Sequence, residues 1–284
     1  MSVPTTIGGA TMQGASREAL AQASAQLERV LETTSADDAA TISDELFAVV
    51  TLIDEQVGLR RALTDPAIDA SRKSGLVEAV LASRVNAATL QTVRELVSSR
   101  WSRMRDLADA AEQLAVLARL IGADRARSGQ SDEVEDELFR FARIVESRPA
   151  LREAIGDRNL PRENKVSLVE ALLAQKTTPA TLALAVQLVS HPRGRTPEEG
   201  LAEYGEIASR RRQRLVARVT TAIALTDDER SRLRAALAIL YGHDVHLQIE
   251  LDPQVVGGLV VQVGDEVIDG SVAGRLAQAR QRLK

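Results

Sequence analysis

The feature that most constrains the fold of this chain is an internal repeat. When the sequence is shifted by 92 positions, residues 44–98 align with residues 136–190 without a gap, and 21 of the 55 aligned positions are identical. The tetrapeptide DELF, for example, occurs at residues 44–47 and again at residues 136–139. Chance similarity between Ala-rich and Leu-rich helices does not hold one register over such a length. The sequence therefore predicts a duplicated domain.

Each copy of the repeat has the pattern of short amphipathic helices. Aromatic residues make up only 2% of the chain, which leaves the core to Ala, Leu and Val and suits helices better than sheets. A helix over residues 16–31 would open the first bundle, and one over 110–127 would leave the first bundle and begin the second. We therefore expect two small bundles joined by a shared or continuous helix. The expected helix caps are Asp69 or Ser71, Asn86, Asn159 before Pro161, and Thr178 before Pro179.

The pattern changes near residue 209. Residues 215–225 alternate between apolar and other side chains, which is typical of a half-buried strand. Thr226 and Glu229 then form a capping-box signature for a helix. We expect that helix to end at Gly242 and to bury Leu233, Leu237 and Leu240.

Three more strands and a final helix complete this module. The residues over 245–251 again alternate, and a hairpin is predicted to turn at Gly264-Asp265. A last helix would begin after Ser271. The predicted fold is mainly α, with two tandem helical bundles followed by a small α+β domain. The expected parts are a flexible tail over 1–15, a first bundle over 16–118, a second over 119–208 and the α+β domain over 209–284.

No residue pattern predicts an active site. The chain has no cysteine, which excludes disulfides, thiolate metal sites and cysteine nucleophiles. His243 and His246 straddle the start of a strand, where alternate side chains point to opposite faces, so we interpret them as solvated rather than as metal ligands. No glycine-rich phosphate-binding signature follows a predicted strand. We expect neither a cofactor nor enzymatic activity.

Two basic segments permit a binding interpretation. The segment His191-Pro192-Arg193-Gly194-Arg195 would either end a helix or meet a phosphate group, and we favour helix termination. The basic run over 210–214 would be a docking surface for an acidic helix or a solvated linker. Nucleic-acid binding is the weaker hypothesis, because the chain has few aromatic side chains to stack on bases.

Residues 252–276 contain, in order, a Gly-Gly pair, an apolar strand, a Gly-Asp turn, the run Ile-Asp-Gly-Ser and an Arg-Leu pair. This segment resembles the C-terminal signature of the ATP synthase delta subunit family, whose mitochondrial member is the oligomycin sensitivity conferral protein. A usual member has one bundle, and the two bundles here resemble an actinobacterial form. The motif residues are Gly257, Gly258, Gly264, Asp265, Asp269, Gly270, Ser271 and Arg275.

The resemblance implies a non-catalytic stator subunit of a bacterial F-type ATP synthase, which resists rotor torque during proton-driven ATP synthesis. The implied partners are alpha subunits of the catalytic head, with beta subunits as a further contact, and a separate b-type stalk subunit bound by residues 209–284. The implied location is the cytoplasmic face of the cell membrane, with membrane association only through the complex and no nucleic acid bound. A helical-repeat adaptor or nucleic-acid-binding scaffold is the alternative.

The resemblance also implies which surfaces bind the alpha subunits. In the family, the first and fifth helices of the bundle grip an N-terminal helix of an alpha subunit. Here these helices would be residues 16–31 with 89–99, and residues 114–127 with 181–190. The expected partner-binding residues are Leu20, Leu27, Leu90, Val93, Val97, Leu117, Leu182, Val186 and Val189.

Overall fold

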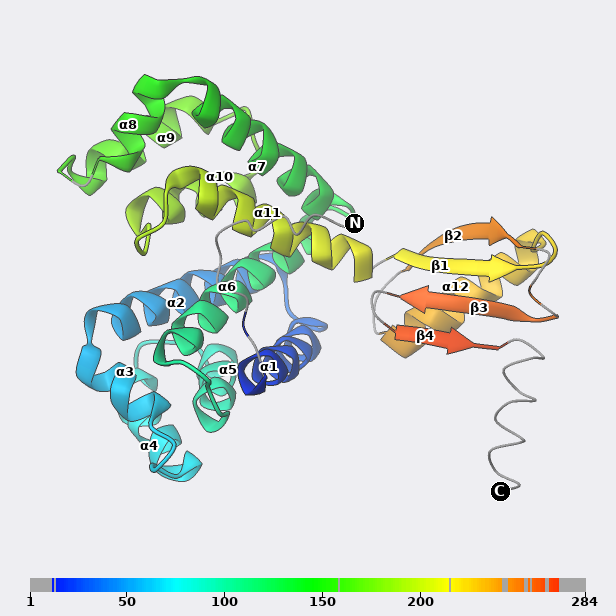
Figure 1. Ribbon diagram of the computed structural model, residues 1–284, viewed down its shortest axis with the longest axis horizontal. Helices are drawn as coiled ribbons and strands as arrows, with labels where there is room; N and C mark the ends of the chain where they lie inside the picture. Colours follow the sequence, from blue (N-terminus) through cyan, green and yellow to red (C-terminus); the bar gives the residue numbers. More distant parts are fainter. Residues whose placement is uncertain are drawn as a thin grey trace, which may run out of the picture. The chain divides into compact units, whose positions relative to one another are not determined.

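The computed structural model describes residues 12, 14–157, 159–214, 216–241, 245–252, 255, 257–263 and 266–270. The chain divides into two compact units, a helical unit over residues 1–208 and a smaller α+β unit over residues 209–284 (Figure 1). The mainly α fold class is therefore confirmed. The helices of the first unit, the last of which runs into the second, are α1 Ala15–Leu31, α2 Ala36–Glu55, α3 Val57–Thr64, α4 Ala70–Leu81, α5 Ala87–Ser98, α6 Met104–Ala126, α7 Gln130–Ser147, α8 Pro149–Gly156, α9 Arg162–Leu173, α10 Pro179–Ser190 and α11 Pro197–Arg214.

The internal repeat is visible in the helix boundaries. The bounds of α8, α9 and α10 are those of α3, α4 and α5 shifted by 92 residues, and α7 ends 92 residues after α2. The caps explain several of these starts, because the side chains of Asp69, Asn86 and Thr178 each accept a hydrogen bond from a backbone N–H of the first helical turn. The expectation for Asn159 is wrong: Pro161 itself is the N-cap of α9 and makes no side-chain cap bond.

Helix α6 belongs to both copies. It starts at Met104, six residues before the expected start at 110, and its residues 107–123 lie 92 positions after those of α1. It packs against α1, α2, α3 and α5 of the first copy and against α7 and α10 of the second. Sixteen of its 23 residues are buried, so one core runs through the helical unit. The expected division between residues 118 and 119 lies inside this helix and stays a prediction.

A glutamate carboxylate ties the second helix of each copy to the fifth. Glu45 of α2 accepts a hydrogen bond of 2.5 Å from the hydroxyl of Thr89, at the start of α5. At the equivalent positions 92 residues later, Glu137 of α7 accepts bonds of 2.6 Å from the Thr181 hydroxyl and 2.9 Å from the Thr178 N–H. The glutamate therefore satisfies the free N-terminal donors of the fifth helix. This polar contact gives a structural role to the glutamate that the DELF run repeats.

Replacing Glu137 with glutamine should lower the free energy of unfolding by about 1–2 kcal/mol, because a neutral amide accepts weaker hydrogen bonds than a carboxylate. The Thr178 N–H and the hydroxyls of Thr178 and Thr181 all donate to one carboxylate oxygen of Glu137. Urea unfolding followed by far-ultraviolet circular dichroism measures the change. Glu170→Gln, at an exposed position of α9, is the control and should shift unfolding by less than about 0.5 kcal/mol. Equal effects of the two substitutions would contradict the role of Glu137.

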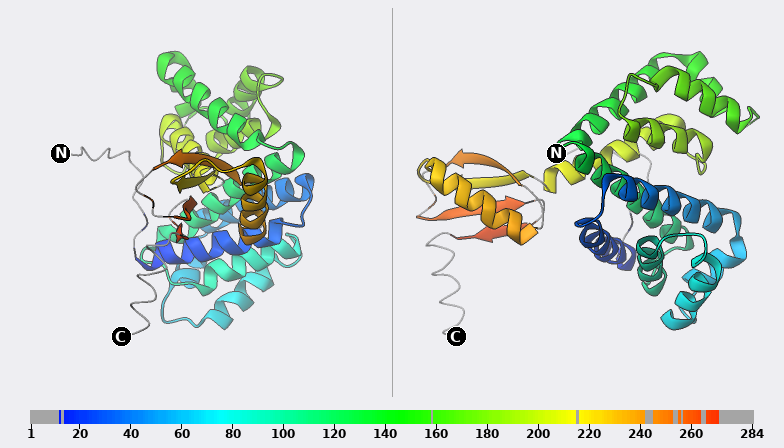
Figure 2. Two further views of the ribbon diagram at one scale, coloured as in Figure 1. Left: turned by 90° about the vertical axis from the view of Figure 1, so that its right-hand side faces the viewer. Right: turned by 180° about the vertical axis from the view of Figure 1, so that it is seen from behind.

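The described part of the α+β unit is a four-stranded sheet crossed by one helix. Its elements are β1 Val216–Thr221, α12 Asp227–Tyr241, β2 His246–Leu251, β3 Leu259–Val263 and β4 Glu266–Asp269. The strand order is β2-β1-β3-β4; β1 and β2 are parallel, and the other pairs are antiparallel. The parallel pair needs a crossover connection, which α12 supplies as it lies across one face of the sheet (Figure 2).

The sequence patterns of this unit are mostly confirmed. Glu229 accepts a 2.8 Å hydrogen bond from the Thr226 N–H, as a capping box requires, and Leu237 is buried against the sheet. The expectation for Leu240 is wrong, since this side chain is 62% exposed. A helix on a sheet this small buries a narrower stripe than its apolar pattern offers. The predicted strand is also too long, since β1 ends at Thr221. Leu215, Gly242, the Gly264-Asp265 turn, His243 and the helix after Ser271 lie outside the described residues.

Candidate functional site

The helices expected to form the two partner-binding grooves lie together in both copies. Helix α1 contacts α5, and α6 contacts α10. Four of the expected partner-binding residues are half-buried at the edge of the core, and five lie within it. The half-buried residues are Leu20, Leu90, Leu182 and Val186, and the buried ones are Leu27, Val93, Val97, Leu117 and Val189. The half-buried side chains are therefore the part of each stripe that a docked helix can reach.

A cluster of ion pairs, which sequence reasoning missed, joins the two copies at Arg193. This residue lies in the loop between α10 and α11, and its side chain is only 7% exposed. Its guanidinium group donates to Asp54 at the end of α2 over 2.5 Å, to Asp109 of α6 over 2.8 Å, and to Glu112 of α6. Arg193 has a positive φ of 52°, as does Gly194 at 79°, so the loop turns sharply where the side chain enters the cluster.

Arg195 and Tyr204 extend the cluster into α11. Arg195 pairs with Glu112 and, at 2.5 Å, with Glu203. The buried Tyr204 hydroxyl donates a 2.7 Å hydrogen bond to Glu112, and its ring lies 6.4 Å from that of Phe47 between centroids. Tyr204 of α11 therefore contacts both α2 and α6.

The charges in this cluster compensate one another. Burial by itself would raise the pKa of the Glu112 carboxyl, but Arg193 and Arg195 hold it below its usual value. Burial does raise the pKa of Asp109, with Arg193 and Arg105 opposing the effect. Burial by itself would lower the pKa of Arg193, but Glu112 and the two aspartates raise it above its usual value. Since these arginines are engaged by carboxylates and His191 ends α10, helix termination is the correct interpretation of the His191–Arg195 loop.

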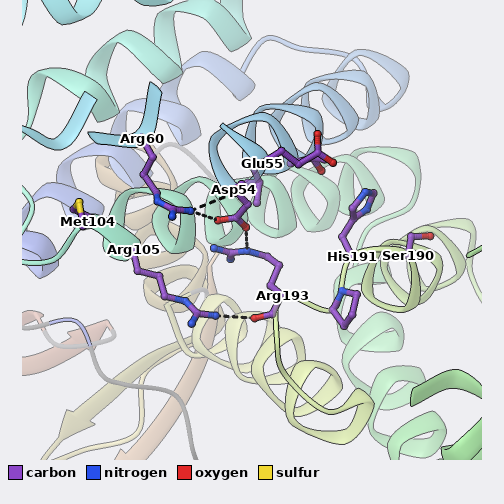
Figure 3. A pocket seen from close by; sticks show the side chains of 11 residues that line it. Asp54, Glu55, Arg60, Met104, Arg105, Ser190, His191 and Arg193 are labelled. Carbon is purple, nitrogen blue, oxygen red and sulfur yellow. Dashed lines mark hydrogen bonds and ion pairs between the residues drawn. The ribbon is translucent and has the colours of Figure 1, made fainter. Parts of the chain in front are cut away.

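A cleft of about 660 Å³ opens beside the cluster (Figure 3). Its charged lining residues are largely paired with one another: Arg60 with Asp54 at 3.5 Å, and Arg105 with the carbonyl oxygen of Arg193 at 2.7 Å. Burial and the nearby Arg162 lower the pKa of His191 in its wall. Within the described ranges, no three His, Asp or Glu residues are grouped so that they could hold a metal ion. The geometry is that of a structural joint between the copies.

The motif residues of the α+β unit have backbone roles where the structure describes them. Gly257 and Gly258 have φ values of 63° and 82° ahead of β3, a conformation that favours glycine. Asp269 pairs with Val260 across β3 and β4, and the Gly270 N–H donates to the Leu259 carbonyl oxygen at 3.0 Å. A Cβ atom at Gly270 would lie 3.1 Å from that oxygen. The motif residues Gly264, Asp265, Ser271 and Arg275 lie outside the described residues.

The sequence matches the ATP synthase delta (OSCP) subunit family over residues 21–121 and over residues 123–283. The chain belongs to this family. The two matched regions meet inside α6; the first includes α2 to α5, and the second includes α7 to α10 and the strands of the α+β unit. The family resemblance of the C-terminal motif is thereby confirmed.

Relatives of similar length align with almost the whole chain. ATP synthase subunit delta of Acidothermus cellulolyticus is 57% identical over 274 residues, covering 96% of this chain and 99% of the relative. The subunit of the same name in Streptomyces avermitilis is 50% identical over 273 residues, and that of Thermobifida fusca is 46% identical over 272; each alignment covers 96% of this chain and 99% of the relative.

Family membership makes the chain a peripheral-stalk subunit of an F-type ATP synthase and not one of its catalytic subunits. It favours the stator hypothesis over a general adaptor or nucleic-acid-binding scaffold. Among the helices that the structure describes, none combines the length and apolar character needed to cross a membrane.

Proposed function

We propose that the chain ties the catalytic head of the enzyme to the b-type stalk subunit at the cytoplasmic face of the membrane, and so resists rotor torque. Each helical copy holds an N-terminal helix of an alpha subunit, with beta subunits as a further contact. The α+β unit over 209–284 binds the b-type subunit, and the chain is held at the membrane only through the complex. Family membership and the repeated helix pairs support this assignment.

The observation that carries the proposal is the equivalence of the two grooves. Leu90 on α5 and Leu182 on α10 occupy the same position of the repeat, and both are half-buried at the edge of the core. An amphipathic helix docks on such a surface through apolar side chains at helical spacing. Nanomolar holding corresponds to about 12 kcal/mol, and two linked grooves raise the effective concentration for the second contact.

Titration of the full chain with a synthetic peptide of the alpha N-terminal helix should give two bound peptides per chain. Leu90→Arg and Leu182→Arg should each remove one site, because a charged side chain in an apolar contact is left without a partner. Isothermal titration calorimetry measures the stoichiometry. Gln91→Arg, which adds the same charge at an exposed position next to Leu90, should leave both sites. A stoichiometry of one or zero for the unsubstituted chain would contradict two active grooves.

A further inference from the structure

One phenylalanine of the repeat is buried in the first copy and exposed in the second. Phe47 of α2 and Phe139 of α7 are the same residue at positions 92 apart, within the repeated DELF run. Phe47 is 4% exposed, whereas Phe139 is 66% exposed, although the chain has only three phenylalanines. Covering the ring of Phe139 with a partner would gain hydrophobic free energy in proportion to the apolar area removed from water.

The first copy shows what covers this position. The ring of Tyr204 on α11 lies against Phe47, at 6.4 Å between centroids. Seven residues further along α2, on the same helix face, Asp54 pairs with Arg193, which precedes α11. The segment from Arg193 to Tyr204 therefore covers α2 with an aromatic ring and a guanidinium group.

Helix α7 carries counterparts of both groups that this segment covers on α2. Glu146 is equivalent to Asp54, so α7 carries an aromatic ring and a carboxylate seven residues apart, as α2 does. Glu146 is exposed and contacts Arg143 of its own helix at 2.9 Å. In the part of the chain that the structure describes, no side chain covers Phe139 as Tyr204 covers Phe47. Apart from the buried Glu137, the α7 helix has five acidic and two basic residues, which favours a basic partner.

We propose that the face of α7 formed by Phe139 and Glu146 is a docking surface for a basic amphipathic helix of another polypeptide. That helix presents an aromatic side chain to Phe139 and an arginine to Glu146, in the way that the α11 segment covers Phe47 and Asp54. This surface is distinct from the α1/α5 and α6/α10 grooves. It gives the second copy an interaction that the first copy makes within the chain.

A synthetic peptide with the sequence of residues 191–212, which contains both Arg193 and Tyr204, is the probe. Calorimetric titration of the full chain should show one bound peptide. Phe139→Ser should weaken binding at least tenfold, and Glu146→Gln by about threefold with a shallower salt dependence. A peptide with serine in place of its tyrosine should lose binding to the same extent. Because Phe139 is exposed, the substituted chain should keep the thermal unfolding midpoint of the original.

The control substitution is Ile239→Ser, which removes another largely exposed apolar side chain, from α12, and should not change binding. Absence of peptide binding would overturn the proposal. So would equal binding by Phe139→Ser, since a peptide that displaced α11 from Phe47 would behave in this way. Analytical ultracentrifugation measures whether the full chain forms a dimer. A dimer that is dissociated by Phe139→Ser would assign the surface to self-association and would overturn the assignment to another polypeptide.

Discussion

Substitution of Arg193 by methionine is expected to lower the free energy of unfolding of the helical unit by about 3–5 kcal/mol. The Arg193 side chain is only 7% exposed and donates to three carboxylates, those of Asp54, Asp109 and Glu112. Methionine fills much of the space but provides no charge, so the acidic groups would be left near one another in a dry environment. Removal of one partner from a buried ion pair costs more than the pair contributes, because the remaining charge has lost its solvation.

Guanidinium chloride unfolding of the full chain, followed by far-ultraviolet circular dichroism, measures this effect. The control is Arg143→Met on α7, whose side chain is 68% exposed and pairs with a neighbouring exposed glutamate. That substitution should cost less than about 1 kcal/mol, as exposed pairs do. Adding Glu112→Gln to Arg193→Met should recover part of the loss, since it removes one uncompensated charge. A cost for Arg193→Met as small as that of the control would show that the cluster is solvated and does not join the copies.

The same substitution at equivalent positions of the repeat should have opposite consequences. Phe47→Ala is expected to destabilise the helical unit by about 3–5 kcal/mol, because it opens a cavity beneath Tyr204 in the core. Phe139→Ala should change stability by less than about 0.5 kcal/mol, since that ring is already largely in water. The repeat supplies the matched control, because the residue removed and its place in the helix are the same.

Thermal and denaturant unfolding of the two variants and of the unsubstituted chain measures the stability change caused by each substitution. Similar losses for both would mean that Phe139 is covered in solution, and similar small effects would mean that the contact between α2 and α11 is loose. The comparison isolates the contribution of α11 to the first copy, since an equivalent cover over Phe139 is not provided by the described residues.

The sequence predicted the helical elements well because their information is local. The 92-residue register identifies the second copy, and side chains such as Asn86 and Thr178 fix helix starts through bonds within one turn. The Thr226–Glu229 box is local in the same sense. The cap expected at Asn159 is wrong because Pro161, two residues later, is itself the N-cap of α9.

The contacts that distinguish the copies could not be predicted from local patterns. Arg193 meets Asp54 across 139 positions of the sequence, and no spacing rule indicates such a pair. Periodicity also cannot separate a core residue from a surface one when both lie on one stripe, so Val97 and Leu90 were expected to be equivalent although only Leu90 is accessible. Repeat symmetry likewise predicts the same surroundings for Phe47 and Phe139, and tertiary packing overrides it.

Helix α6 has a mechanical consequence for a subunit of a stalk. Two bundles connected by a loop can swing about it, because a loop has soft backbone torsions and offers little elastic resistance. Here one helix is both the last of the first bundle and the first of the second, so the two bundles share a rod of hydrogen-bonded backbone in place of a loop. The ion pairs of Arg193 with Asp109 and Glu112 hold the loop between α10 and α11 against the side of this helix. Bending the pair would require deformation of the helix itself, which makes the helical unit a stiff strut with little compliance between its halves.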